Sequence, residues 1–159
     1  MRIAFIIIFI LVLLFLQIGI FPHLSIAGVF PNLILLSILG LSILQGWKKT
    51  LPWTIAGGLF LDFYSLTGVL GLSVVGLLIV SYLAYFLSQN IFKKANLFSL
   101  ALNFLIAIFV YSLCLLILFS VFSVISDFRF LTFIVAIIYN LVFALPIFYL
   151  IKLLTKKTA

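Results

Sequence analysis

Long uninterrupted apolar runs, separated by short polar breaks, restrict the fold of this chain more than any other feature. A helix of about 20 apolar residues spans the ~30 Å hydrocarbon core of a bilayer. Transmembrane β-strands alternate apolar and polar residues, whereas these runs are continuous, so they predict helices. Only 7% of the 159 residues are charged, which is too few for a water-facing surface. We therefore expect an all-α membrane protein with a single integral-membrane helical domain over residues 1–159.

The spacing of the polar breaks predicts a compact bundle of six transmembrane helices. Their expected ranges are about residues 3–21, 32–46, 52–65, 72–88, 97–124 and 130–154. Pro52 is expected near the first turn of the third helix, where proline is favoured. The second and third helices are short, because roughly 13 to 15 residues at ~1.5 Å each reach only ~20 to 22 Å. Either the bilayer thins there, or the proline-bracketed segment 22–31 or a partner covers their outer ends.

The cations of the chain are segregated by this arrangement, because alternate loops of a six-helix bundle lie on opposite sides of the membrane. Arg129 alone falls on one side, and the positive-inside rule then places both termini in the cytoplasm. The cations form small juxtamembrane pairs, so topology and the anionic headgroups of the bilayer explain the net charge of +7 better than nucleic acid does. The cations expected on the cytoplasmic side are Arg2, Lys48, Lys49, Lys93, Lys94, Lys152, Lys156 and Lys157.

Stripes of small and weakly polar residues indicate which helix faces pack, because such residues allow close backbone approach and interhelical hydrogen bonds. They predict that the last three helices pack against one another, with Asn103 and Asn140 making polar contacts across the bundle. The first helix is bulky and apolar apart from Ala4 and Gln17, so it faces either lipid or the apolar helix of another protein. The stripes are Ser73, Gly76, Ser81, Ala84 and Ser88 on the fourth helix, Ser99, Asn103, Ala107 and Cys114 on the fifth, and Thr132, Ala136, Asn140 and Ala144 on the sixth.

Asp62 is the one acidic residue inside an apolar segment, and a carboxylate at membrane depth usually marks a site or a packing joint. Gly58 lies one turn earlier on the same helix face, which leaves space beneath the carboxylate. Two interpretations stay open. In the structural one, the carboxylate accepts hydrogen bonds from Ser65, Thr67 or free backbone amides at the start of the fourth helix. In the functional one, it binds a cation, a proton or a basic group of a partner.

Catalytic and metal-binding chemistry is not expected. The sequence has no nucleophile with a histidine base in reach, no carboxylate pair in the bilayer, no Cys/His cluster and no phosphate loop. We therefore expect neither an enzyme nor a cofactor. An ion pathway through Asp62 would need Asn103 and Asn140 in line with it, and hence the fifth and sixth helices beside the third.

One stretch of the chain resembles a known family. Residues 31–33 (Pro-Asn-Leu) open a short apolar helix, residues 58–65 (Gly-Leu-Phe-Leu-Asp-Phe-Tyr-Ser) follow, and residues 68–73 (Gly-Val-Leu-Gly-Leu-Ser) lead into the fourth helix. This order is similar to that of the bacterial rod shape-determining protein MreD family. The chain departs from the family pattern at Leu66 and Thr67, since many members bring the glycine closer to the serine. The resemblance makes these residues structural or partner-binding candidates: Pro31, Asn32, Gly57, Gly58, Asp62, Ser65, Gly68 and Gly71.

The resemblance implies a non-enzymatic, multi-pass subunit of the bacterial cell-elongation complex, the elongasome, in the cytoplasmic (inner) membrane. Such a protein binds the bitopic scaffold protein MreC, and through it connects the MreB filament to the polymerase RodA with its transpeptidase for peptidoglycan synthesis. The family is also similar in fold to the S components of energy-coupling-factor vitamin transporters, which gives an alternative function. An S component usually carries an Ala-x-x-x-Ala pattern in its first helix, and this chain lacks one.

Overall fold

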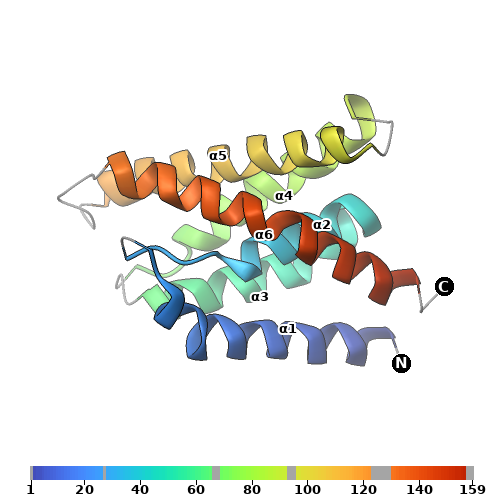
Figure 1. The fold of residues 1–159 in the computed structure, drawn as a ribbon, viewed down its shortest axis with the longest axis horizontal. Helices are drawn as coiled ribbons and strands as arrows, with labels where there is room; N and C mark the ends of the chain where they lie inside the picture. Colours follow the sequence, from blue (N-terminus) through green and yellow to red (C-terminus); the bar gives the residue numbers. More distant parts are fainter. Residues whose placement is uncertain (1, 27, 66–68, 93–95, 123–129, 157–159) are drawn as a thin grey trace.

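The computed structural model describes residues 2–26, 28–65, 69–92, 96–122 and 130–156, and these residues form six α-helices and one short 3-10 helix (Figure 1). The first helix, α1, is followed by the 3-10 helix η1, and both precede the buried helix α2. Five of the six α-helices lie within a few residues of their predicted ranges. In order the elements are α1 (Arg2–Gly19), η1 (Phe21–Leu24), α2 (Leu33–Gln45), α3 (Trp47–Ser65), α4 (Leu72–Asn90), α5 (Leu97–Val121) and α6 (Phe130–Lys156).

The predicted start of the third helix was wrong. Helix α3 begins at Trp47, directly after Gly46, and Pro52 lies inside it rather than in its first turn. Gly46 adopts a positive φ of 89°, which turns the chain tightly enough for one helix to follow the other. Pro52 removes only the amide that would bond to the carbonyl of Lys48, near the exposed end of the helix. Since α3 has 19 residues, it reaches ~28 Å and is not a short helix.

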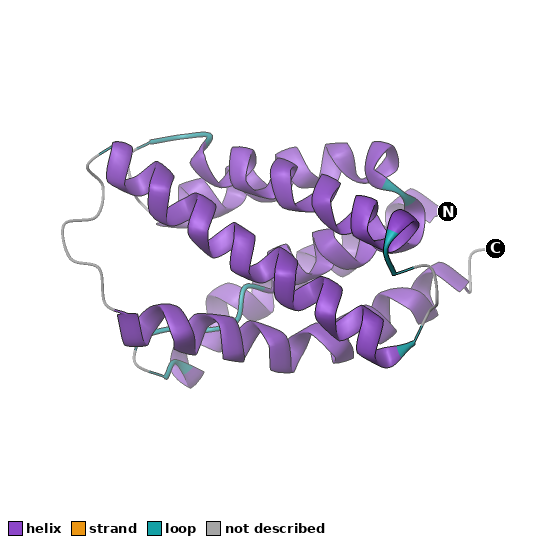
Figure 2. Ribbon diagram, turned by 90° about the horizontal axis from the view of Figure 1, so that it is seen from above, coloured by secondary structure: helices purple, strands orange, loops and turns teal. Residues whose placement is uncertain are grey.

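Helix α2 is the centre of the bundle. It contacts every other α-helix, and its ten consecutive residues from Leu33 to Ser42 are all buried. A helix that is apolar all round can be surrounded in this way, because no face of it needs water or lipid. Figure 2 shows that the bundle is built of helices joined by short loops.

The segment before α2 is folded back on itself and contacts α6. Phe21 is buried and meets the Phe143 ring of α6 edge-on, with ring centroids 5.4 Å apart. Ile26 and Val29 exchange two backbone hydrogen bonds of 2.9 Å across Gly28, which has a φ of +76°, and Pro31 is buried. Helix α2 has 13 residues, ~20 Å, so it is short as predicted.

The packing of the last three helices differs from the prediction in one respect. Helix α4 contacts α5, and α5 contacts α6, but α4 and α6 form no interface of their own among the described residues because α2 lies between them. Helix α3 packs on α2 and α4 rather than on α5 or α6. The arrangement that an ion pathway from Asp62 through Asn103 and Asn140 would require is therefore not the one observed.

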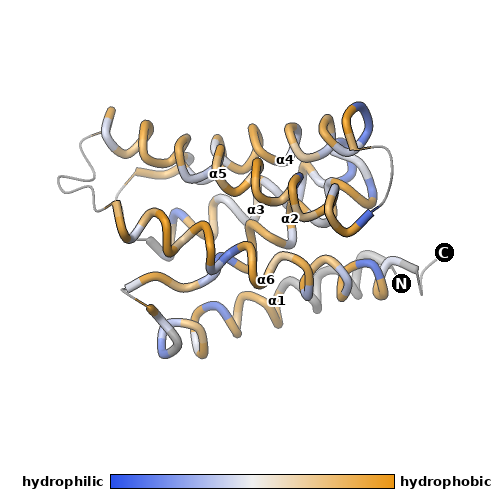
Figure 3. The backbone as a smooth tube through the Cα atoms, turned by 45° about the horizontal axis from the view of Figure 1, so that its top comes forward, coloured by the Kyte–Doolittle hydropathy of each residue, from blue (hydrophilic) through white to orange (hydrophobic). Residues whose placement is uncertain are grey.

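The ends of the bundle differ in charge. The start of α1, the turn from α2 to α3 and the end of α6 lie at one end (Figure 1), and this end carries Lys48, Lys49 and Lys152. We call it the lysine end. The helices between the two ends are hydrophobic over most of their length (Figure 3), and α4, α5 and α6 are each long and apolar enough to cross a membrane. Two shorter apolar helical segments are Leu11–His23 and Leu33–Gln45, so the chain is a multi-pass membrane protein.

Candidate functional site

Asp62, near the end of α3, holds the start of α4. Its side chain is only 3% exposed. One carboxylate oxygen accepts a hydrogen bond of 2.7 Å from the Gly71 amide and the other a bond of 2.8 Å from the Ser73 amide. The first amides of a helix have no partners within the helix, and they carry its positive dipole end. The two bonds therefore supply acceptors to these amides and stabilise the buried negative charge.

Two glycines allow α3 and α4 to meet at this point. Gly71 has a φ of +101°, which a residue with a side chain adopts only at a cost, and this conformation aims its amide at Asp62. A Cβ on Gly58 would lie 2.6 Å from the Cα of Val74, so the two backbones are in direct contact there. The space expected beneath the Asp62 carboxylate is thus occupied by helix α4.

The neighbouring glycine faces a different helix. A Cβ on Gly57 would lie 2.8 Å from the Ile34 side chain and 2.9 Å from that of Ile38, both on α2. Adjacent residues on a helix point about 100° apart. The glycine pair therefore lets α3 approach α2 on one side and α4 on the other.

A second set of polar side chains holds the start of α2. The Asn32 side chain caps its own helix by accepting from the Leu35 amide at 3.0 Å. Gln17 of α1 accepts from the Ile34 amide at 3.2 Å, and Asn140 of α6 accepts from the Asn32 amide at 2.7 Å. Asn140 also donates to the Ala136 carbonyl of its own helix at 2.8 Å. Three helices thus provide acceptors for the buried amides at the beginning of α2.

Tyr111 of α5 connects the two sets. Its side chain lies close to Ser73, Asn32 and Asp62. Gly76 of α4 leaves room for the ring, because a Cβ there would lie 3.2 Å from the Tyr111 ring. We call the six side chains Gln17, Asn32, Asp62, Ser73, Tyr111 and Asn140 the polar joint, and each of the six helices or their caps contributes one of them.

The polar joint lies at membrane depth. Asn140 is ten residues after the start of α6, and Tyr111 is ten residues before the end of α5, which places both ~15 Å from those helix ends. Buried polar side chains at this depth fix the rotation and register of the helices that they join. The groups of the polar joint are suited to hydrogen bonding between helices, and no group of three potential metal ligands occurs in the part of the chain that the structure describes.

The remaining predicted residues have different positions. The Asn103 side chain lies near the lysine end and donates to the Ala84 carbonyl of α4 at 3.0 Å. Ser65 is the last residue of α3, but its side chain and all of Gly68 lie outside the described residues, as does the turn with Asp127 and Arg129.

Sequence reasoning missed three residues that hold the bundle. Gln17 was noted only as an exception in an apolar helix, and Tyr111 and Gly40 were not considered. A Cβ on Gly40 of α2 would lie 2.9 Å from the Ile151 side chain of α6. The available signals were an amide in an otherwise apolar run, a hydroxyl-bearing ring in the middle of α5, and the small residues Ser37, Gly40 and Ser42 of α2.

One of the comparisons with known proteins identifies a family for this chain. Comparison with curated proteins and with solved structures returned no match. The family described as rod shape-determining protein MreD matches residues 1–154. Since this match extends from the first helix through nearly all of the last, the chain belongs to the MreD family of rod shape-determining membrane proteins.

Proposed function

We propose that this protein is a non-enzymatic subunit of the bacterial elongasome that binds an MreC-type bitopic protein in the cytoplasmic membrane. The family match over residues 1–154 carries this proposal. Through that partner it is connected indirectly to the MreB filament and to RodA with its transpeptidase. The chain acts as one domain with both termini in the cytoplasm, and its bundle belongs to the S-component type of fold. The common end of the described lysines supports this orientation.

The polar joint has a structural role in this proposal. Asp62 fixes the end of α3 against the start of α4, so that the two helices present one rigid outer face. Ile55, Leu59 and Phe63 form an exposed apolar row on α3, four residues apart. Val75 and Ile79 form a second exposed apolar row on α4. We infer that the membrane helix of the MreC-type partner lies along these rows, called here the α3–α4 face.

Site-specific photocrosslinking in native membranes tests this proposal. A photoreactive residue at Leu59 or Phe63 is expected to give an adduct with the MreC-type protein. The same residue at Val142, which is exposed on α6, is the matched control and is expected to give none. Adducts at Val142 but not at Leu59 or Phe63 would move the partner to another face.

Purification of the crosslinked chain followed by mass spectrometry tests the function itself. Recovery of an MreC-like protein with cell-wall synthases is the expected result. Recovery of an ATPase module with its coupling subunit would overturn the proposal in favour of a transporter.

The role of the polar joint is tested separately with Asp62→Ala. This variant is expected to give less of the Phe63 adduct and fewer rod-shaped cells. If folding, partner binding and cell shape all persist in that variant, the polar joint does not prepare the partner face.

A further inference from the structure

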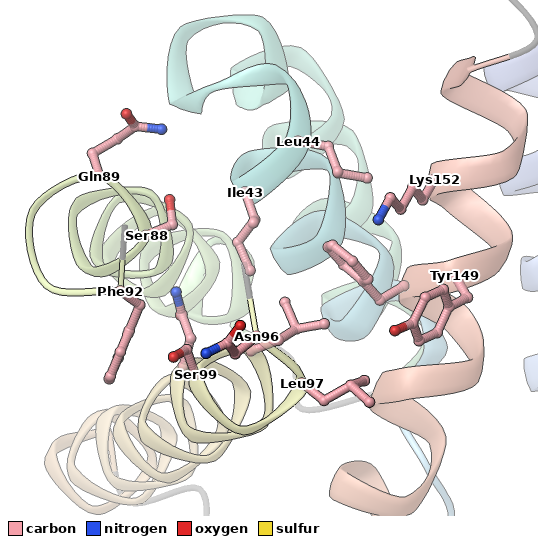
Figure 4. Close-up of a pocket in the computed structure, with 13 residues that line it drawn as sticks. Ile43, Leu44, Ser88, Gln89, Phe92, Asn96, Leu97, Ser99, Tyr149 and Lys152 are labelled. Carbon is pink, nitrogen blue, oxygen red and sulfur yellow. The ribbon is translucent and has the colours of Figure 1, made fainter. Parts of the chain in front are cut away.

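A cavity of about 310 Å³ lies between α2, α4, α5 and α6 near the lysine end of the bundle (Figure 4). This volume is at the lower limit of small-molecule sites. Apolar side chains such as Leu44, Leu100 and Phe148 form part of its wall. The polar part consists of Ser88, Gln89, Asn96, Ser99, Asn103 and Lys152. The cavity is separate from the polar joint and has no role in the proposed partner contact.

One wall of the cavity holds a buried acceptor without a hydrogen bond. Asn103 is 2% exposed, and its amide nitrogen donates to the Ala84 carbonyl at 3.0 Å. Its Oδ1 atom has no hydrogen-bond partner in the part of the chain that the structure describes. A buried acceptor left unpaired is costly. A group that donates a hydrogen bond from within the cavity would relieve this cost.

The opposite side of the cavity attracts negative charge. The Lys152 ammonium group points toward the cavity and lies 5.8 Å from the centre of the Tyr149 ring (Figure 4). Asn96, the N-cap of α5, makes no capping bond with its side chain in the described part of the chain, and the positive end of the helix dipole lies beside it. Asp62, the acidic residue among those described, lies in the polar joint. The cavity therefore combines a cation and a helix start with an unpaired acceptor.

The surroundings of the cavity select an amphipathic ligand. The cavity lies near the lysine end, where the helices would meet the headgroup layer. Phe98 of α5 and Leu153 of α6 are strongly exposed apolar side chains of the two helices that border it. The volume suits a polar headgroup and not acyl chains, which would lie outside along these apolar faces. Basic pockets between helices on the cytoplasmic side commonly bind anionic lipid headgroups.

We propose that this cavity binds the headgroup of an anionic phospholipid that carries a hydroxyl group, such as phosphatidylglycerol. The phosphate lies between Lys152 and the start of α5. The headgroup hydroxyl donates a hydrogen bond to Oδ1 of Asn103.

Native mass spectrometry of the purified full chain in detergent tests this site. Three probe lipids separate the contributions: phosphatidylglycerol, phosphatidylmethanol with the same charge but no hydroxyl, and zwitterionic phosphatidylcholine. The wild type is expected to bind phosphatidylglycerol most tightly. Lys152→Gln is expected to weaken its binding about fivefold, the effect of one lysine near an anionic lipid. Lys49→Gln is the matched control, since it removes an exposed lysine from the same end outside the cavity, and is expected to retain binding.

Asn103→Leu tests the hydroxyl contact. The variant is expected to abolish the preference for phosphatidylglycerol over phosphatidylmethanol. If the Asn103 variant does not fold, lipid binding by Lys152→Gln still tests the site. Equal binding of these two lipids by the wild type would overturn the hydroxyl contact. An equal loss of phosphatidylglycerol binding in Lys152→Gln and Lys49→Gln would overturn the placement of the phosphate beside Lys152. Displacement of the lipid by an equal concentration of sn-glycerol 1-phosphate would assign the cavity to a soluble phosphate ester instead.

Discussion

A single buried carboxylate connects two helices in this protein. Asp62 accepts backbone hydrogen bonds from Gly71 and Ser73, so the unpaired amides at the start of α4 stabilise its negative charge. Hydrogen bonds to a charged group contribute about 1.5 to 3 kcal/mol each. The bonds are possible because Gly71 has a positive φ and Gly58 lets the backbones touch. Asp62, Gly58 and Gly71 therefore act together to join α3 to α4.

Removing the carboxylate is expected to destabilise the fold. Asp62→Ala would leave two amides without this acceptor and lower the free energy of unfolding by about 3 kcal/mol. Asp62→Asn keeps one acceptor oxygen and is expected to lose about half as much. Denaturant unfolding in detergent micelles measures both values. Asn90→Ala is the control, because the exposed Asn90 side chain bonds to the Phe86 carbonyl of its own helix. Equal stability of all three variants would contradict the role of Asp62.

At the scale of the helices, α2 decides the architecture. It is short, buried along ten consecutive residues and held at its start by side chains from α1 and α6. Near the end of α2, the Ser42 hydroxyl donates to the Ser81 carbonyl of α4 at 2.6 Å. A helix held by its neighbours at both ends needs no lipid-facing surface of its own. Its length therefore follows from the interior of the bundle rather than from bilayer thickness.

The start of α2 is expected to open locally when its outside acceptors are removed. Gln17→Ala or Asn140→Ala would each leave one buried amide unpaired, at a cost of about 1 to 3 kcal/mol. Hydrogen exchange of the amides from Asn32 to Leu35 should then accelerate about tenfold or more, since ~1.4 kcal/mol corresponds to a factor of ten. Ser37→Ala is the control, because the Ser37 hydroxyl bonds to the Leu33 carbonyl within α2. Unchanged exchange in both variants would show that the start of α2 does not depend on these acceptors.

The helix interfaces are expected to tolerate added methyl groups in a definite order. Gly40→Ala meets the tip of the Ile151 side chain, which can rotate away. Gly57→Ala meets Ile34 at its branch near the backbone, and Gly58→Ala meets the Val74 backbone itself. Overpacking costs typically 1 to 3 kcal/mol and more where nothing can move, so stability should fall from Gly40 through Gly57 to Gly58. Thermal unfolding of the three variants beside Gly19→Ala, whose position has open space, checks the order, and a destabilised Gly40 variant with an unaffected Gly58 variant would reverse it.

At the scale of the whole molecule, charge and burial divide the bundle along its length. The described lysines lie at one end, where Lys152 also borders the proposed lipid cavity, whereas the polar joint lies deep in the apolar layer. Large apolar side chains are exposed on α3, α4, α5 and α6, which suits a surface in contact with lipid and with the helix of a partner. The molecule thus combines an oriented membrane position with a stiff interior.

The orientation can be measured with single cysteines. In a Cys114→Ser background, Ser25→Cys and Lys49→Cys introduce thiols at exposed positions of the segment before α2 and of the lysine end. A membrane-impermeant maleimide is expected to label Ser25→Cys in intact spheroplasts and Lys49→Cys only in inverted vesicles, because the proposed orientation places the lysine end in the cytoplasm. The opposite pattern would invert the proposed topology.

The sequence by itself determined the class of the protein, its six helices and its resemblance to the MreD family. The class and the helices follow from the length of the apolar runs, on which hydrophobicity acts directly, and the resemblance follows from the motifs of residues 31–73. The importance of the Asp62 stretch was also visible, because one carboxylate in an apolar chain is conspicuous.

Only the tertiary structure decided which helix is central and what each polar side chain binds. Nearly all the helices are apolar on every side, so their sequences carry little information about rotation or neighbours. Helix tilt and rotation determine three of the observed features. Gly57 and Gly58 face different helices, α2 separates α4 from α6, and Gln17 and Tyr111 belong to the polar joint. The physical reason is that packing and interhelical hydrogen bonds set these angles in a membrane, and both exist only after the helices meet.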